Sequence, residues 1–112
     1  MKKIELLAPA GDEEALKAAI MAGANAVYMG GSRFGARAFA GNFEDDKLID
    51  AVDYAHQMGV KIYITANTII KDEEIGDFLN YIDFLYEIGV DAVILQDLGM
   101  IDIISLNYSY NF

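Results

Sequence analysis

The sequence predicts an α/β protein of four consecutive βα units with parallel strands, equivalent to half of a TIM-type (β/α)8 barrel. The first observation is a repeated pattern, in which a stretch of helical period ends at a glycine and a short β-rich run follows. Residues 18–31, 53–67 and 83–97 share this pattern, with glycines at 23, 59 and 89. The second observation is the spacing of roughly 30 to 36 residues, which is the size of one βα unit. The third is the alternation of polar and apolar residues over 61–67, which is typical of a strand with two unlike faces.

The expected elements follow from local signals in chain order. The acids after Asp12 suit the start of a helix, Asn42 is a plausible cap for the second helix, and apolar residues recur at helical spacing over 75–85. We expect strands at about 3–8, 26–30, 61–66 and 92–96, and helices at about 12–22, 43–58, 73–88 and 98–106. Residues 1–105 then form one partial barrel domain, and residues 106–112 form an irregular tail without a clear period.

Two architectures fit this order of elements, an open doubly wound sheet and a piece of a barrel. Strand parity places one set of polar side chains together on one face, while Ile62, Ile64 and Ala66 lie on the other. The polar set comprises Glu5, Tyr28, Tyr63, Thr65, Asn67 and Gln96. A sheet between two helix layers is apolar on both faces, so this asymmetry favours the barrel.

The length of the chain complicates the barrel interpretation. A full barrel needs about 250 residues, and this chain has 112. Its first and last strands would present unpaired edges, and its inner face would meet water. We therefore expect either a segment of a longer protein whose C-terminal half is missing, or a half-barrel that pairs with a second copy as a homo-oligomer.

Composition excludes several classes of function. The net charge of −10 argues against a general nucleic-acid-binding surface, but it is compatible with one local basic patch. The chain has no cysteine, so it supplies no disulfide, thiolate metal site or iron–sulfur ligand, and we expect no cofactor in this chain. The N-terminal sequence does not have the pattern of a signal peptide, and no apolar run approaches the length of a membrane span. We expect a cytoplasmic protein without a membrane partner.

The stretch "GGSRFGARAFAGNF" (30–43) is the first candidate site. It is longer than most connections from strand to helix, and long loops often carry function. Gly30 and Gly31 allow close approach of the backbone to a bound group, and Arg33 and Arg37 suit a carboxylate or phosphate. The alternative is that both arginines pair with local acids. The glycines do not follow the dinucleotide-binding pattern.

Further candidates lie on the polar face and at the strand ends. Glu5 and Asp97 are candidate catalytic acid or base groups. For Glu5 the reason is that a carboxyl partly desolvated inside a strand has a raised pKa. The alternatives are that Glu5 bonds an arginine or Tyr28, and that Asp97 caps the short helix at 98. Asn67 and Gln96, at the ends of their strands, are candidate substrate-binding residues or partners of nearby loops.

Proteolytic machinery is not apparent. His56 is the only histidine, and without a second ligand a metalloprotease zinc site is unsupported; we expect no metal and a structural role for His56. Ser32 lacks the context of a serine nucleophile.

The chain resembles the N-terminal part of the peptidase U32 family. Four spaced blocks carry the resemblance, to about residue 105: "ELLAPAGDEEALKAAIMAGANAVYMGG" (5–31), "FGARAFAGNF" (34–43), "AVDYAHQMGVKIYITANT" (51–68) and "YEIGVDAVILQDLGMI" (86–101). The family includes collagenase-like proteases of the hydrolase class, and other members are implicated in hydroxylation of a pyrimidine in transfer or ribosomal RNA. The resemblance implies a barrel-type domain and a peptide or RNA-related substrate in full-length members.

This sequence departs from the family in being much shorter, in lacking the downstream cysteines associated with an iron–sulfur cluster, and in its ending "SLNYSYNF". Two hypotheses follow. The chain is the N-terminal barrel fragment of a U32-type protein, inactive alone, that contributes a pocket at the strand ends. Alternatively, it is a non-catalytic folded fragment that self-associates through its open edges.

Overall fold

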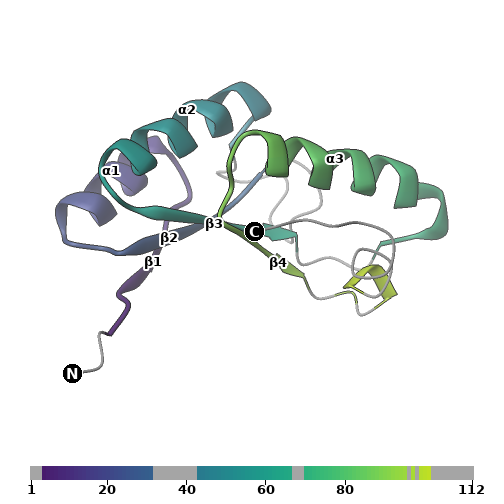
Figure 1. Cartoon of the computed structure of the whole chain (residues 1–112), viewed down its shortest axis with the longest axis horizontal. Coiled ribbons are helices and arrows are strands. Elements are labelled where there is room, and N and C mark those ends of the chain that lie inside the picture. Colours follow the sequence, from purple (N-terminus) through teal and green to yellow (C-terminus); the bar gives the residue numbers. More distant parts are fainter. Residues whose placement is uncertain (1–3, 32–42, 67–69, 96, 98, 102–112) are drawn as a thin grey trace.

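The computed structural model describes residues 4–31, 43–66, 70–95, 97 and 99–101. Strands and helices alternate in these residues, as the sequence predicts (Figure 1). The elements are β1(Leu7–Pro9), α1(Glu13–Met21), β2(Ala26–Gly30), α2(Asp45–Gln57), β3(Lys61–Ala66), the 3₁₀ turn η1(Asp72–Glu74), α3(Ile75–Glu87) and β4(Ala92–Leu95).

The four strands form one parallel sheet in the order β1-β2-β3-β4. The register aligns side chains of neighbouring strands in rows that share a face. One face carries the rows Leu7–Ala26–Lys61, Pro9–Tyr28–Tyr63–Ala92 and Gly30–Thr65–Ile94. The other face carries the rows Ala8–Val27–Ile62, Met29–Ile64–Val93 and Ala66–Leu95.

All three α-helices cover the second of these faces (Figure 1). Val27, Ile62 and Ile64 are fully buried there. Each longer helix contributes one stripe at helical spacing, which is how an amphipathic helix buries its apolar side. The stripes are Leu48, Ala51, Val52 and Ala55 from α2, and Phe78, Tyr81, Ile82 and Leu85 from α3. The hydrophobic core thus lies between the helices and one side of the sheet, and the row from Pro9 to Ala92 lies on the side that no described helix covers. We call that side the open face.

The repeated glycines end the helices as predicted. Gly23, Gly59 and Gly89 have φ of 97°, 74° and 90°, in the left-handed region that glycine adopts without strain. Each directly follows the C-terminal cap of its helix and turns the chain toward the next strand.

Most element boundaries lie within two residues of the sequence prediction, and the start of the first strand differs by more. The helix expected at about 98–106 lies mostly outside the described residues, of which 99–101 are helical. The first strand begins at Leu7 rather than near residue 3, because the N–H of Leu6 bonds the side chain of Asn25 at 2.7 Å instead of extending the ladder. Helix α2 begins at Asp45 with Glu44 in the cap position, so Asn42 is not the cap residue. Asn42 itself lies outside the described residues.

The fold of the described residues is therefore a four-stranded parallel α/β sheet with helices on one side. No helix in these segments is both long and apolar enough to cross a membrane.

Candidate functional site

The carboxyl ends of the four strands lie together at one end of the sheet, which we call the carboxyl edge. The segment 32–42, which contains both arginines, follows β2 at this carboxyl edge. At the end of β2, the carbonyl of Gly30 accepts a hydrogen bond from the N–H of Phe43 at 3.1 Å, and Gly31 forms a parallel bridge with Phe43. Phe43 is buried, which anchors the return of the chain. Both ends of the segment 32–42 are thus fixed at the carboxyl end of β2.

Gly31 lies against Tyr81 of α3. A Cβ atom at Gly31 would lie 1.9 Å from the Tyr81 hydroxyl oxygen and 3.1 Å from Cζ. Tyr81 is fully buried, and its ring stacks with Phe84 at a centroid distance of 6.3 Å. Glycine is therefore required at position 31 by packing against α3, in addition to any role near a ligand.

Asp97 connects two strand ends. Its Oδ2 accepts the N–H of Ile70 at 2.8 Å, and its Oδ1 accepts the N–H of Met100 at 3.2 Å. The hydrogen bond from Ile70, followed by those from Met100 and Gly99, lowers the pKa of the Asp97 carboxyl below its ordinary 3.8. The prediction that Asp97 caps the helical turn after β4 is confirmed by the Met100 bond. Its bond to Ile70 also fixes the chain that follows β3, so Asp97 shapes this edge of the sheet as an anion.

Tyr63 and Glu5 form the principal polar contact on the open face. The Tyr63 hydroxyl donates to Oε1 of Glu5 at 2.7 Å. This hydrogen bond, with smaller effects of desolvation and nearby negative charge, raises the pKa of Tyr63 above 10.0. Glu5 precedes β1 and Tyr63 lies on β3, so their bond crosses over β2. Ala26, on the open face of β2, is completely buried.

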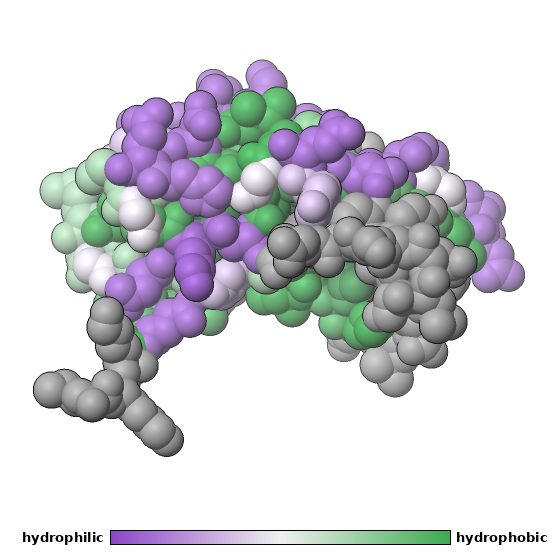
Figure 2. Space-filling view, viewed as in Figure 1, coloured by the Kyte–Doolittle hydropathy of each residue, from purple (hydrophilic) through white to green (hydrophobic). Residues whose placement is uncertain are grey.

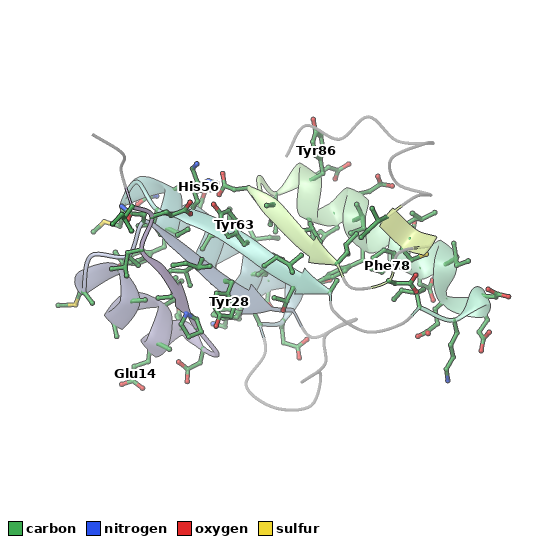
Figure 3. The ribbon with its side chains drawn as sticks, turned by 90° about the horizontal axis from the view of Figure 1, so that it is seen from below. Glu14, Tyr28, His56, Tyr63, Phe78 and Tyr86 are labelled. Carbon is green, nitrogen blue, oxygen red and sulfur yellow. The ribbon has the colours of Figure 1, made fainter. Side chains whose placement is uncertain are left out.

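Glu5 differs from the sequence expectation in its surroundings. It is exposed and precedes β1, so the expected desolvation within a strand is wrong. Its partner is Tyr63 rather than Tyr28. Tyr28 and Tyr63 lie on neighbouring strands in the same row of the open face (Figure 3). Glu5 stands before the first strand and Asp97 after the last, at opposite ends of the sheet, so these two carboxyls do not form a pair.

His56 lies at the amino-terminal end of the sheet, away from the candidate edge. Its Nε2 is 2.7 Å from Oδ2 of Asp91, which also accepts the N–H of Ile62 at 2.8 Å. The contact joins the end of α2 to the start of β4 (Figure 3). This geometry agrees with the expected structural role of His56.

Several predicted site residues lie outside the described part of the chain: Arg33, Arg37, Asn67 and Gln96. Ser32 does as well. Among the residues that the structure describes, no three His, Asp or Glu side chains converge as a metal site would require. Sequence reasoning missed Tyr81 and Ile70 as partners of this edge. Neither had a signal, because both contacts join residues far apart in the chain.

Comparison with known proteins identifies relatives of this chain. The sequence profile of Peptidase family U32 matches residues 11–110. The match continues past residue 105, where we expected the similarity to the family to end. The chain is 45% identical over 101 residues to the 23S rRNA 5-hydroxycytidine C2501 synthase of Escherichia coli (strain K12), covering 90% of this chain and 15% of that protein.

Two other relatives carry different names. The chain is 40% identical over 96 residues to tRNA hydroxylation protein P1 of Bacillus subtilis (strain 168), covering 86% of this chain and 23% of the relative. It is 39% identical over 96 residues to a collagenase of Porphyromonas gingivalis (strain ATCC BAA-308 / W83), covering 85% and 23%. The chain therefore spans less than a quarter of each of these three proteins.

A solved structure, that of the U32 peptidase Mk0906, superposes with a TM-score of 0.77 over 98% of this chain and 47% of that one, at 12% sequence identity. At this identity the superposition shows a shared fold.

Proposed function

This chain belongs to peptidase family U32, and from that premise we propose that it is the N-terminal half of a (β/α)8 barrel acting in pyrimidine hydroxylation of transfer or ribosomal RNA. The observation that carries the proposal is the 45% identity to a protein named for hydroxycytidine synthesis in ribosomal RNA. The name of the tRNA hydroxylation relative points in the same direction.

The arrangement of helices and strands supports the half-barrel. Sequential strand order with every described α-helix on one face is the pattern of a (β/α)8 barrel, whereas a doubly wound sheet carries helices on both faces. Polar groups of Tyr28, Tyr63 and Thr65 then lie on the side that becomes the barrel interior. In such barrels the active site lies at the carboxyl ends of the strands, where this chain has Gly30 and Asp97.

Proteolysis receives less support from the residues of this chain. The single histidine is bonded to Asp91 at the amino-terminal end of the sheet, opposite the edge where barrel chemistry occurs. A nucleophile at the carboxyl edge would therefore lack a histidine base from this chain.

The proposed pocket combines the loop and the strand ends. In this proposal Arg33 and Arg37 bind an RNA phosphate with paired donors, and Gly30 and Gly31 allow the backbone to approach it closely. Asn67 and Gln96 hydrogen-bond the base, and Asp97 positions the segment after β3 through Ile70. Glu5 precedes β1 and so lies at the amino-terminal end of the sheet, away from this pocket. It can act as an acid or base only on a substrate that extends along the open face to that end.

Cofactor chemistry would have to come from other segments. The chain contains no cysteine, so its residues do not fit an iron–sulfur cluster, and we assign no step to one. We further propose that the protein works in the cytoplasm, where its RNA substrate would be found.

A binding comparison tests the proposal. Fluorescence anisotropy would measure a labelled cytidine-containing RNA hairpin and a labelled Gly-Pro-rich collagen-type peptide against the parent, Arg37→Ala and Lys47→Ala. Losing a charge-assisted phosphate contact should weaken RNA binding about tenfold in Arg37→Ala, or about 1.4 kcal/mol. Lys47 is an exposed residue of α2 in the helix layer, so its variant should bind as the parent does. Preferential binding of the peptide, or equal effects of both substitutions, would contradict the proposal.

A further inference from the structure

The sheet leaves one face and two edges uncovered in the described part of the chain. β1 pairs only with β2, and β4 pairs only with β3. Leu7 on β1 is 45% exposed and Ile94 on β4 is 42% exposed, and both side chains belong to the open face. In the side-on surface view, hydrophobic residues gather at the lower edge of the molecule on the side of β4, and hydrophilic residues gather at the lower edge on the side of β1 (Figure 2).

We propose that the open face is a self-association surface, and that two copies of this chain close into one eight-stranded parallel barrel. The proposal rests on the half-barrel arrangement proposed above, and it adds a partner that this arrangement does not require. A two-fold axis along the barrel axis would place β1 of each copy beside β4 of the other. Both new contacts are then identical by symmetry.

Strand geometry agrees with this closure. Four parallel strands from each copy give the eight of a closed barrel. A two-fold axis along the barrel axis keeps every strand pointing toward the same end of the barrel, so the new pairs are parallel like the existing ones. Leu7 and Ile94 both project from the open face, and across the new β1–β4 contact both would face the barrel interior.

The chemistry of the open face also suits a second copy. Closure removes the two exposed apolar side chains from water, which favours association. Lys61 and Glu5 carry opposite charges, and both lie on the exposed amino-terminal side of this face. Two-fold symmetry brings two of each together at one mouth of the barrel, where the charges balance.

Pro9 limits how the β1 edge can pair. The N–H of Ala10 bonds the carbonyl of Tyr28 on β2, so the alternation of the strand turns the nitrogen of Pro9 toward the free side. Proline has no N–H to donate, so closure forgoes one ladder bond in each contact. Proline on an edge strand also hinders pairing with the strands of unrelated chains. A partner of β1 must therefore contribute side-chain contacts in addition to backbone hydrogen bonds.

Association state is the first test. Sedimentation equilibrium of the 112-residue chain should give twice its mass of 12.3 kDa. Ile94→Lys places a charge on the open face and should raise the dissociation constant at least about tenfold, because lysine on an edge strand opposes pairing. The matched control is Met21→Lys, which replaces an 86% exposed residue at the end of α1 and should change the constant less than about twofold. Circular dichroism would establish that both variants are folded.

Cysteine cross-linking tests the geometry, since the chain has no native cysteine. Within one chain β1 and β4 are three strand spacings apart, about 14 Å, which exceeds the roughly 7 Å limit for a disulfide. The double variant Leu7→Cys/Ile94→Cys should therefore form covalent dimers on oxidation. Leu7→Cys alone should not, because in the proposed dimer Leu7 meets β4 of the partner copy.

The outcomes separate this inference from the proposed function. A folded chain that stays monomeric up to millimolar concentration overturns self-association while leaving the RNA proposal intact. Cross-linking of Leu7→Cys alone would indicate that β1 pairs with β1, and it overturns the closed barrel. A dimer that is equally sensitive to Met21→Lys and Ile94→Lys overturns the open face as its contact.

Discussion

Replacing Gly31 with alanine should destabilise the protein through a single identifiable contact. The added Cβ would lie 1.9 Å from the hydroxyl oxygen of Tyr81, a separation that real structures do not tolerate. Tyr81 cannot easily move away, because it is fully buried and packs against Phe84. Overpacking of this kind costs about 1–3 kcal/mol.

Urea unfolding followed by circular dichroism measures this cost. With a denaturant slope of about 2 kcal/mol per molar for a small domain, a loss of about 2 kcal/mol lowers the Gly31→Ala midpoint by about 1 M. All variants should be compared at one protein concentration, because association would contribute to stability.

A second substitution identifies the cause. Tyr81→Phe removes the hydroxyl and leaves Cζ at 3.1 Å from the new Cβ, a contact that small shifts can relieve. The double variant should therefore recover at least about 1 kcal/mol relative to the sum of the two single variants. Gly76→Ala is the control, because nothing lies within 4 Å of its added Cβ and it is a helical glycine; it should stabilise by up to about 1 kcal/mol. Additive effects of Gly31→Ala and Tyr81→Phe would refute the reasoning.

Three further predictions concern single side chains. Asp12→Ala removes the cap bond to the N–H of residue 15 and should cost about 1 kcal/mol, seen as faster amide exchange in the first turn of α1. Glu5→Gln should move the pKa of Tyr63 down toward 10.0, as measured by carbon NMR of labelled tyrosine. In the parent, the bond from Tyr63 to Glu5 contributes fully to folding stability below pH 10, and this contribution is lost as pH rises through the raised pKa of Tyr63. Asp97→Asn should have a lower free energy of unfolding than the parent at neutral pH, and this difference should disappear as pH falls through the lowered pKa of Asp97, below 3.8. A difference that does not change with pH would contradict the role of the Asp97 carboxylate as a hydrogen-bond acceptor.

The sequence was sufficient for the features that depend on local chain conformation. The left-handed glycines 23, 59 and 89 each required a residue without a side chain directly after a helix, and β2 and β3 were predicted at their observed bounds. The alternation of side chains over residues 62–66 correctly separated the helix-covered face from the open face. Successive side chains of a strand point to opposite faces because of backbone geometry alone.

Contacts between distant segments could not be predicted in this way. The bonds of Glu5 to Tyr63 and of His56 to Asp91 join residues 58 and 35 positions apart. The partner of Glu5 depends on strand register and the partner of His56 on how α2 packs beside the sheet, and a single sequence specifies neither to the residue. The late start of β1 has the same origin, because the side chain of Asn25 replaces a ladder partner for Leu6.

Mapping a bound nucleotide tests the central claim most directly, namely that ligand binds at the carboxyl ends of the strands. Amide NMR spectra of the chain would be followed during titration with cytidine monophosphate. We predict chemical-shift changes concentrated at Gly30, Gly31 and Asp97, with little change at His56 and Asp91 at the opposite end. Changes concentrated around His56 and Asp91, or none at millimolar nucleotide, would contradict the account.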